Sequence, residues 1–412
     1  MTDKEILRQL ATEYMEIATL AKQKETMNLI KAFNRKDKVR PIVTIFQLPW
    51  NELVAGDEFL KLKCENKFLR NNVEMFFRRE IYRWNNYQTD MPLEPVLKIP
   101  YAVNNTGYGL KIEQKILATD PNNSVKSHAF INQFEDFEDL DKIKEMKITL
   151  NEKLSVENKD LVENLIGDII PIHQEGGANI RTAFWDILAE MMSVEEIYYQ
   201  LIDQPEFLHA LMDRLTNSAL AGIKQMNELK LAAVSNNYCH CSPIYTDELL
   251  PDFVSTKEPL SYNTWACAMA QLFTSTSPAV TEEFEIPYIS KIAKEFGMFY
   301  YGCCERLDDR LDIVQKIPNL RKVSCSPWSD KEKFAQNLDP KIIMSVKPTP
   351  AYLAMPDFDS ELIRKDLIQT CEIAKSYGLN VELLLKDVST LKNDPTRLTR
   401  WAKIAMEVVN NY

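Results

Sequence analysis

Residues 297–347, GMFYYGCCERLDDRLDIVQKIPNLRKVSCSPWSDKEKFAQNLDPKIIMSVK, carry the alternation that decides the fold. Three short strand-like runs at 297–303, 322–325 and 342–346 are separated by longer segments whose apolar residues have helical spacing. A strand followed by a helix and then by another strand forms a right-handed crossover between parallel strands. This stretch therefore predicts consecutive β-α units of an α/β protein.

The same rhythm extends over most of the chain after residue 150. Further strand candidates occur at 168–172, 231–235 and 379–385, and helix candidates lie near 182–201, 204–228, 281–296, 307–317, 330–338, 360–377 and 395–410. Together with a strand at 41–46 and one that the pattern does not locate, these units would close a (β/α)8 TIM barrel. A doubly wound open sheet is the second choice, but the chain contains neither a GxGxxG nor a GxxxxGK(S/T) motif.

The first 150 residues follow a less regular pattern. They are expected to form an N-terminal helical extension, with helices near 3–24 and 66–84, and the first barrel elements. Residues 151–412 are expected to form the remainder of the barrel. Because α/β barrels often use this much chain, we predict one structural domain overall.

Composition and charge exclude several classes of protein. The 412 residues include 60 acidic and 49 Lys or Arg residues, and the formal charge is −11. The basic residues are scattered, which disfavours nucleic acid and anionic membranes as partners. No run approaches the roughly 20 apolar residues of a membrane span, and the charged, helical N-terminus does not resemble a signal peptide. We therefore expect a cytoplasmic protein whose eight cysteines are thiols rather than disulfides.

Residue types that can do chemistry gather where the predicted strands end, which is where TIM barrels build their active sites. These candidates are His173, Asn237, Tyr238, His240, Tyr301, Cys303, Cys304, Glu305, Trp328, Lys347, Lys386 and Asp387. Some have structural explanations, since Glu305 could pair with Arg306 or Arg310. Cys303 and Cys304 are adjacent and would point to opposite sides of a strand, so at most one is expected to face the barrel axis.

Thiolate, imidazole and carboxylate groups at one barrel mouth would suit Zn²⁺, which in catalytic sites has three protein ligands and an open fourth position. The open position would let the metal polarise a substrate oxygen or bind a thiol. A Ser-His-Asp hydrolase is disfavoured, because the chain has four histidines and no GxSxG motif. A Cys-His nucleophile pair, such as Cys304 with His240 or His173, stays open.

Three segments resemble the uroporphyrinogen decarboxylase superfamily. Residues 277–293 are similar to a superfamily helix of the form EF…PY…KI, and residues 201–209 are similar to its DxPE helix start. The most specific match is the block Tyr301-Gly302-Cys303-Cys304-Glu305, followed by Ile317-Pro318-Asn319-Leu320-Arg321 and Ser326-Pro327-Trp328. This block resembles proteins of anaerobic bacteria that are grouped with corrinoid-linked methyltransferases. The resemblance covers roughly residues 160–410.

The resemblance implies a methyltransferase that works with a corrinoid held by a separate carrier protein. In its zinc-dependent members, a His-x-Cys-Gly motif and a later Cys bind the metal. Here Tyr301 stands at the His position and Asp387 stands near the later Cys. The implied zinc site is therefore rebuilt from His240, Cys303, Cys304 and Asp387. An ether or amine demethylating role suits this departure better than methylation of a thiol.

We therefore predict a corrinoid-dependent methyltransferase of the demethylating type, which moves a methyl group between a small methylated substrate and a cobalamin carrier protein. The predicted catalytic residues are Glu305, Tyr301 and His173, and the predicted substrate-binding residues are Tyr238, Trp328, Lys347, Asn237 and Arg181.

Two other functions stay open. The first is a decarboxylase or lyase of the same superfamily that holds a small carboxylic acid with Lys347 or Arg181. The second is a non-catalytic barrel that binds a cobamide or a partner protein, and a homodimer is compatible with each reading. A true uroporphyrinogen decarboxylase is disfavoured, because only Arg40 remains of the basic cluster that would hold its acidic substrate.

Overall fold

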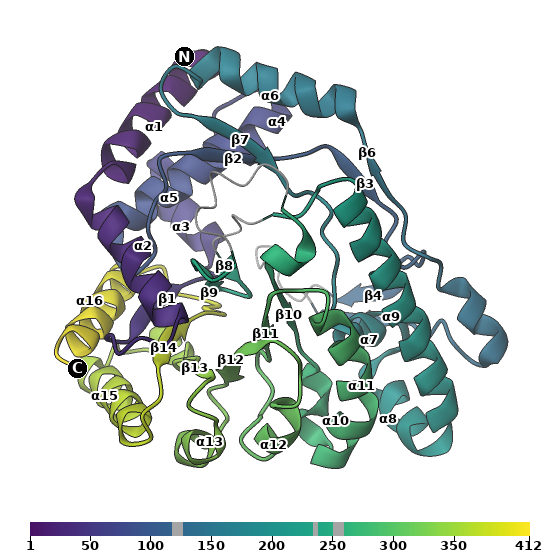
Figure 1. The fold of residues 1–412 in the computed structure, drawn as a ribbon. Helices are drawn as coiled ribbons and strands as arrows, with labels where there is room; N and C mark the ends of the chain where they lie inside the picture. Colours follow the sequence, from purple (N-terminus) through teal and green to yellow (C-terminus); the bar gives the residue numbers. More distant parts are fainter. Residues whose placement is uncertain (118–126, 234–237, 250–258) are drawn as a thin grey trace.

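In the computed structural model, the described residues are 1–117, 127–233, 238–249 and 259–412. Six parallel strands form a curled sheet at their centre (Figure 1). In spatial order these strands are β1 (Ile42–Ile45), β14 (Val381–Leu385), β13 (Ile343–Val346), β12 (Leu320–Cys325), β11 (Met298–Tyr301) and β10 (Trp265–Ala268). The prediction of an α/β protein with parallel strands is confirmed, and its strand at 322–325 begins two residues earlier than expected.

Among the described residues the six strands of this sheet make a half-barrel, and no closed eight-stranded barrel is seen there. Two other strands, β2 (Leu97–Pro100) and β7 (Ile172–Glu175), form a separate parallel pair. A strand was predicted at 231–235, and residues 231–233, the described part of that range, do not form one. The strand that the sequence pattern did not locate within the sheet is β10, whose sequence is Trp-Ala-Cys-Ala and whose two middle residues are only partly buried.

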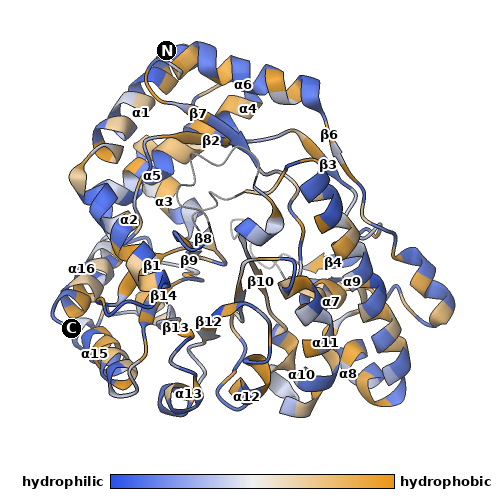
Figure 2. Cartoon of the chain, viewed as in Figure 1, coloured by the Kyte–Doolittle hydropathy of each residue, from blue (hydrophilic) through white to orange (hydrophobic). Residues whose placement is uncertain are grey.

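Helices and short loops cover the outer side of the sheet. The covering helices are α10 (Pro278–Phe284), α11 (Ile286–Ala293), α12 (Leu311–Val314), α13 (Lys331–Asn337), α14 (Ala351–Ala354), α15 (Ser360–Ser376) and α16 (Thr396–Asn410). Every residue of β1, β11, β13 and β14 is buried, as is usual for parallel strands with both faces covered. In Figure 2, polar and apolar residues alternate along helices such as α15, which is the pattern of a helix with one buried face.

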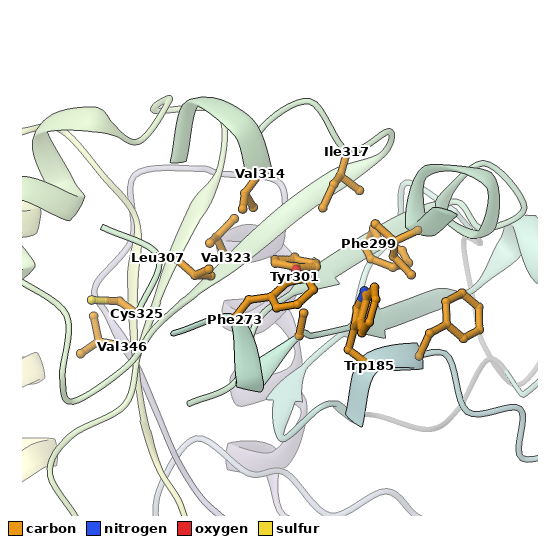
Figure 3. Close-up of a cluster of buried hydrophobic side chains, with 14 of the residues drawn as sticks. Trp185, Phe273, Phe299, Tyr301, Leu307, Val314, Ile317, Val323, Cys325 and Val346 are labelled. Atoms are coloured by element: carbon orange, nitrogen blue, oxygen red, sulfur yellow. The ribbon is translucent and has the colours of Figure 1, made fainter. Parts of the chain in front are cut away.

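The register of β11 decides which of its tyrosines can reach the inner side of the sheet. Phe299 and Tyr301 point into the apolar cluster that contains Trp185 and Phe273 (Figure 3). Side chains alternate along a strand, so Tyr300 points to the opposite face. There its hydroxyl lies 2.9 Å from the hydroxyl of Ser345 on β13.

The N-terminal region packs around the β2–β7 pair. Its helices are α1 (Asp3–Ala18), α2 (Ala21–Asn34), α3 (Trp50–Gly56), α4 (Lys67–Leu69), the π-helical turn η2 (Arg70–Glu74), α5 (Met75–Asn86) and α6 (Glu152–Ile166). Leu7, Phe77, Leu97 and Ile166 belong to one buried cluster that joins these helices to the strand pair. The helix predicted near 3–24 is interrupted, since α1 ends at Ala18 and α2 begins at Ala21.

The middle of the chain supplies three longer helices and several short hairpins. The helices are α7 (Phe184–Met192), α8 (Val194–Asp203) and α9 (Pro205–Glu228). The helix predicted at 182–201 is divided at Ser193, whose φ of 73° is incompatible with a continuous helix. The antiparallel pairs are β3 (Val103–Asn105) with β6 (Ile148–Leu150), β4 (Gln114–Leu117) with β5 (Ser127–Phe130), and β8 (Tyr238–Cys239) with β9 (Ser242–Pro243). Within the described ranges, no helix has the length and apolar character needed to cross a membrane.

Candidate functional site

Gly302 ends β11 with a sharp turn. Its φ is 96°, and a Cβ at this position would lie 2.7 Å from Leu307 Cδ1 and 2.9 Å from Ser324 Cβ. Only glycine adopts this conformation at low cost and leaves room for both neighbours. The Ser324 hydroxyl then donates to the carbonyl oxygen of Cys303 at 2.7 Å, which fixes the chain beyond the turn.

Cys303 and Cys304 lie in this bend, and their Sγ atoms are 3.4 Å apart. The expectation that the two side chains diverge is wrong, because the alternation of a strand stops at Gly302. The two thiols therefore form a single vicinal pair at the C-terminal end of β11. Cys303 is buried and Cys304 is half-buried.

Lys386 joins the thiol pair from the end of β14. Its ammonium donates to Cys303 Sγ at 2.9 Å, and both residues are buried. Hydrogen bonding from Cys304, followed by His240 and Lys386, lowers the pKa of Cys303 well below the ordinary thiol range. Burial opposes the charge on Lys386, but the Cys303 sulfur raises its pKa above the ordinary value. Cys303 is therefore held as a thiolate against an ammonium.

Asp387 completes a chain of contacts around the pair. The thiol of Cys304 donates to Asp387 Oδ2 at 3.5 Å, and Lys386 Nζ lies 3.2 Å from the same oxygen. The hydrogen bond to Cys303 raises the pKa of Cys304, which leaves Cys304 as the protonated partner. Both Cys303 Sγ and Asp387 Oδ2 lie within reach of the single Cys304 thiol proton, and Lys386 is the charged donor to the thiolate.

His240 approaches the pair from the β8–β9 hairpin. The hairpin is anchored on the inner face of the sheet, where the fully buried Lys322 donates to Ser242 Oγ at 2.7 Å and to Glu382 Oε2 at 3.0 Å. His240 lies in the turn with a φ of 45°, and its ring centroid is 5.6 Å from that of Tyr300. Burial lowers the pKa of His240, while its interaction with Cys303 opposes this effect. Its Nε2 atom is buried and has no hydrogen-bond partner among the described residues.

Glu305 is a buried acid that contacts the backbone of the thiol pair. It accepts hydrogen bonds from the backbone N–H of Cys303 at 2.7 Å and of Ala270 at 3.2 Å. Burial, followed by the negative charge of Cys303, raises the pKa of Glu305 to about 7. A carboxyl with this pKa exchanges a proton near neutral pH, which general acid–base catalysis requires. The expected alternative of a salt bridge to Arg306 or Arg310 is not seen, since these pair with Asp308 and Asp309.

Two of the predicted site residues take roles other than those expected. Tyr301 packs in the apolar cluster of Figure 3 on the helix-covered face, so it does not line the inner side of the sheet. Lys347 lies on the inner side, but its ammonium donates to the hydroxyl of Tyr300 and to Ser345 Oγ. Burial lowers the pKa of Lys347 to about 8. Lys347 is thus a buried cation of the site whose ammonium is hydrogen-bonded to two neighbouring hydroxyl groups.

The other predicted residues lie apart from the thiol pair. Trp328, which was predicted to bind substrate, is 72% exposed and projects from the surface. Arg181 forms an ion pair with Glu190 at 2.8 Å. His173 belongs to β7 of the separate strand pair and lies 3.5 Å from Glu175. Asn237 lies outside the described residues.

The zinc prediction does not agree with this geometry. Across residues 1–117, 127–233, 238–249 and 259–412, no three His, Cys, Asp or Glu side chains are arranged as metal ligands. Moreover, Lys386 Nζ already places a positive charge 2.9 Å from Cys303 Sγ, where it would repel a metal cation. The residues predicted to bind zinc are therefore arranged as a thiol–ammonium group. Lys386 was a candidate at a predicted strand end without an assigned role, and Tyr300, which contacts Lys347 and Ser345, was not among the candidates.

A cavity of about 290 Å³ lies next to His240. It is bounded by the turn after β7, the β8–β9 hairpin and β10, and Tyr238 and Cys267 line it together with His240. Tyr238 also packs edge-on against Phe46, with ring centroids 4.7 Å apart. Tyr238 is thus placed at a cavity wall, as its predicted substrate-binding role requires.

Comparisons with known proteins identify the fold. No family model matches the chain, and no curated protein matches it. Among solved structures, a methyltransferase from Methanosarcina mazei matches over 93% of this chain and 98% of its own, with 12% sequence identity and a TM-score of 0.51. At this identity the match establishes a methyltransferase-like fold. The superfamily expected from the sequence stays a prediction.

Proposed function

We propose that this protein is a methyltransferase that moves a methyl group between a small methylated substrate and a corrinoid bound to a separate carrier protein. The observation that carries the proposal is the Cys303 sulfur, held against the Lys386 ammonium at the C-terminal edge of the sheet. The likeness of the fold to a Methanosarcina mazei methyltransferase supports the same class of reaction. The corrinoid carrier and the methylated substrate come from the sequence resemblance.

Methyl transfer is a displacement at carbon, which needs a strong nucleophile and a stabilised leaving group. In the first step, an electron pair of Cys303 Sγ forms the S–CH₃ bond as the bond from the methyl group to the substrate heteroatom breaks. The heteroatom keeps that electron pair and takes a proton. Glu305 is the buried acid beside Cys303 that holds a proton near neutral pH.

In the second step the methyl group leaves Cys303 for the carrier protein. A reduced corrinoid on the carrier protein would supply the nucleophile that takes the methyl group. The S–CH₃ bond would then break, and its electron pair would return to Cys303 Sγ. Lys386 stabilises the departing thiolate, because its ammonium lies within hydrogen-bond distance of the sulfur. The same contact thus supports the sulfur as a nucleophile and as a leaving group.

The decarboxylase alternative has less support. It needs a cation that is free to bind a carboxylate, and Lys347 is engaged by Tyr300 and Ser345. Arg181 forms an ion pair with Glu190. No single observation favours the non-catalytic alternative over methyl transfer.

The proposal is tested by asking where a labelled methyl group goes. The protein is incubated with methylcobalamin carrying a ¹³C-methyl group, in the presence of a metal chelator, and its cysteine peptides are analysed by mass spectrometry. We expect the peptide that contains Cys303 to gain one labelled methyl group, with loss of the methylcobalamin visible spectrum. Cys303→Ser should show neither change, whereas Cys371→Ser, which removes a buried thiol of α15, should behave as the wild type. Unlabelled Cys303 and an unchanged cobalamin spectrum would contradict the proposal.

A further inference from the structure

The cavity next to His240 has a lining without charged side chains. Its described walls include Asn179, Thr182, Trp265 and Cys267, and none of the described lining residues is Asp, Glu, Lys or Arg. An ion that enters such a pocket loses its hydration without gaining a counter-ion. The lining therefore favours an uncharged ligand, and its volume of about 290 Å³ suits a small one.

The aromatic walls do not change this conclusion in favour of a cation. Trp265, Tyr238 and Phe296 line the cavity, and aromatic faces attract cations. However, Lys322 Nζ already lies 5.5 Å from the Trp265 ring centroid. The described lining also offers no carboxylate that would neutralise a cationic ligand, so the aromatic walls are suited to apolar methyl and ring groups.

Two lining residues have hydrogen-bonding atoms that need a partner. His240 Nε2 and Trp265 Nε1 are buried, and neither has a hydrogen-bond partner in the described part of the chain. The indole Nε1–H of Trp265 is a donor only, whereas the role of His240 Nε2 depends on the tautomer of the ring. A buried donor without an acceptor is costly. An ether oxygen or a thioether sulfur is an uncharged acceptor that would satisfy such a donor.

The cavity also lies near the turn that holds the reactive sulfur. Cys267 of β10 lines the cavity, and the backbone N–H of Gly302, the residue before Cys303, donates to the carbonyl oxygen of Ala268 on the same strand at 2.8 Å. We propose that this cavity is the pocket for the methyl donor and that it binds uncharged methyl ethers or thioethers in preference to methylated ammonium ions or carboxylates. The assignment as a donor pocket rests on the proposed methyltransferase function, while the preference for an uncharged ligand rests on the lining alone.

The preference is tested with three probes of similar shape and different charge. Binding of methoxybenzene, phenyltrimethylammonium and 4-methoxybenzoate to the wild-type protein is measured by ligand-observed NMR, without any corrinoid. We expect methoxybenzene to bind at least tenfold more tightly than either ion, and its signals to show contacts with the protein. Equal or tighter binding of one of the ions would overturn the inference.

Two variants of a wall residue place the binding in this cavity. Ala266 of β10 lines the cavity and is not fully buried. Ala266→Asp and Ala266→Asn add nearly the same volume, but only the first adds a charge. We expect both to weaken methoxybenzene binding and only Ala266→Asp to gain affinity for phenyltrimethylammonium, at least fivefold. Unchanged binding of all three probes to a folded Ala266→Asn would show that they bind elsewhere, and this result does not require Ala266→Asp to fold.

The binding result and the proposed function can fail separately. If methoxybenzene binds selectively but no methyl group reaches Cys303 from methylcobalamin, the pocket is confirmed and the methyltransferase proposal is wrong. If methyl transfer occurs but the ammonium probe binds best, the function stands and the preference for an uncharged donor is wrong.

Discussion

Lys386 Nζ lies 2.9 Å from Cys303 Sγ, and this contact joins the end of β14 to the turn after β11 across two intervening strands. The two residues are 83 positions apart in the sequence. The sheet brings them together because the C-terminal ends of its parallel strands share one edge. At this edge one connected chain of contacts links the side chains of Cys303, Cys304, Lys386 and Asp387.

Removing the ammonium is expected to reduce the reactivity of Cys303. The pKa of this thiol is lowered, so the thiolate is present below the ordinary thiol range and is lost only when the pH falls through the lowered pKa. In Lys386→Met one cause of the lowering disappears, so the midpoint of the pH profile for Cys303 alkylation should move to higher pH, by about one unit or ~1.4 kcal/mol. Iodoacetamide labelling followed by mass spectrometry measures the rate.

Lys386→Arg is the matched control for that experiment. It retains a cation at the same position, so its labelling rate should stay closer to the wild type than that of Lys386→Met. The same midpoint for Lys386→Met and the wild type would show that the ammonium does not hold the thiolate.

Glu305 should make the stability of the protein depend on pH between about 4.5 and 7. Its folded-state pKa is about 7 and its ordinary value is 4.5. The folded state therefore binds the proton more tightly, so the stabilisation is fully present below pH 4.5 and is lost as the pH rises through 7. The difference of pKa corresponds to about 3 kcal/mol at most. Urea unfolding of the wild type and of Glu305→Gln at pH 5 and pH 8 measures it.

Glu305→Gln resembles the protonated acid, so its free energy of unfolding should vary less between pH 5 and pH 8 than that of the wild type. If the two proteins show the same pH dependence, the proton of Glu305 is not taken up near neutral pH. The acid role assigned to Glu305 would then fail as well.

The turn at Gly302 should tolerate no side chain. In Gly302→Ala the φ of 96° is strained, and the new Cβ would lie 2.7 Å from Leu307 and 2.9 Å from Ser324. We expect a loss of about 1–3 kcal/mol of unfolding free energy and a displaced thiol pair. Gly56→Ala is the control, because nothing lies within 4 Å of its Cβ and its φ is not positive. Thermal unfolding compares the two, and equal melting temperatures would contradict the strain argument.

The sequence was sufficient for the strand–helix rhythm and for most strands of the sheet. The runs at 297–303 and 342–346 are so rich in apolar residues that burial on both faces follows directly. The sequence did not show which face of the sheet Tyr300 and Tyr301 occupy. A shift of one residue exchanges the two faces of a strand, and nothing local fixes that shift. Lys386 was visible at a predicted strand end, but its partner depends on a contact 83 residues away. The prediction that the side chains of Cys303 and Cys304 diverge was wrong for a different reason. Gly302 ends the strand, and with it the alternation of side chains, before the two cysteines.

Mild oxidation should inactivate the protein at the vicinal thiols. The Cys303 thiolate attacks hydrogen peroxide, and one oxygen is transferred to sulfur to give the sulfenic acid while hydroxide leaves. Cys304 Sγ, 3.4 Å away, then displaces the hydroxyl group as water and forms a disulfide with Cys303. Mass spectrometry should therefore find both residues in one oxidised peptide, and a thiol reductant should restore alkylation of Cys303. In Cys304→Ser the second step has no sulfur, so the same treatment should leave sulfenic and then sulfinic acid on Cys303, which the reductant restores only in part. If the wild type also proceeds to sulfinic acid without a disulfide, the two sulfurs do not meet in solution as they do in the structure.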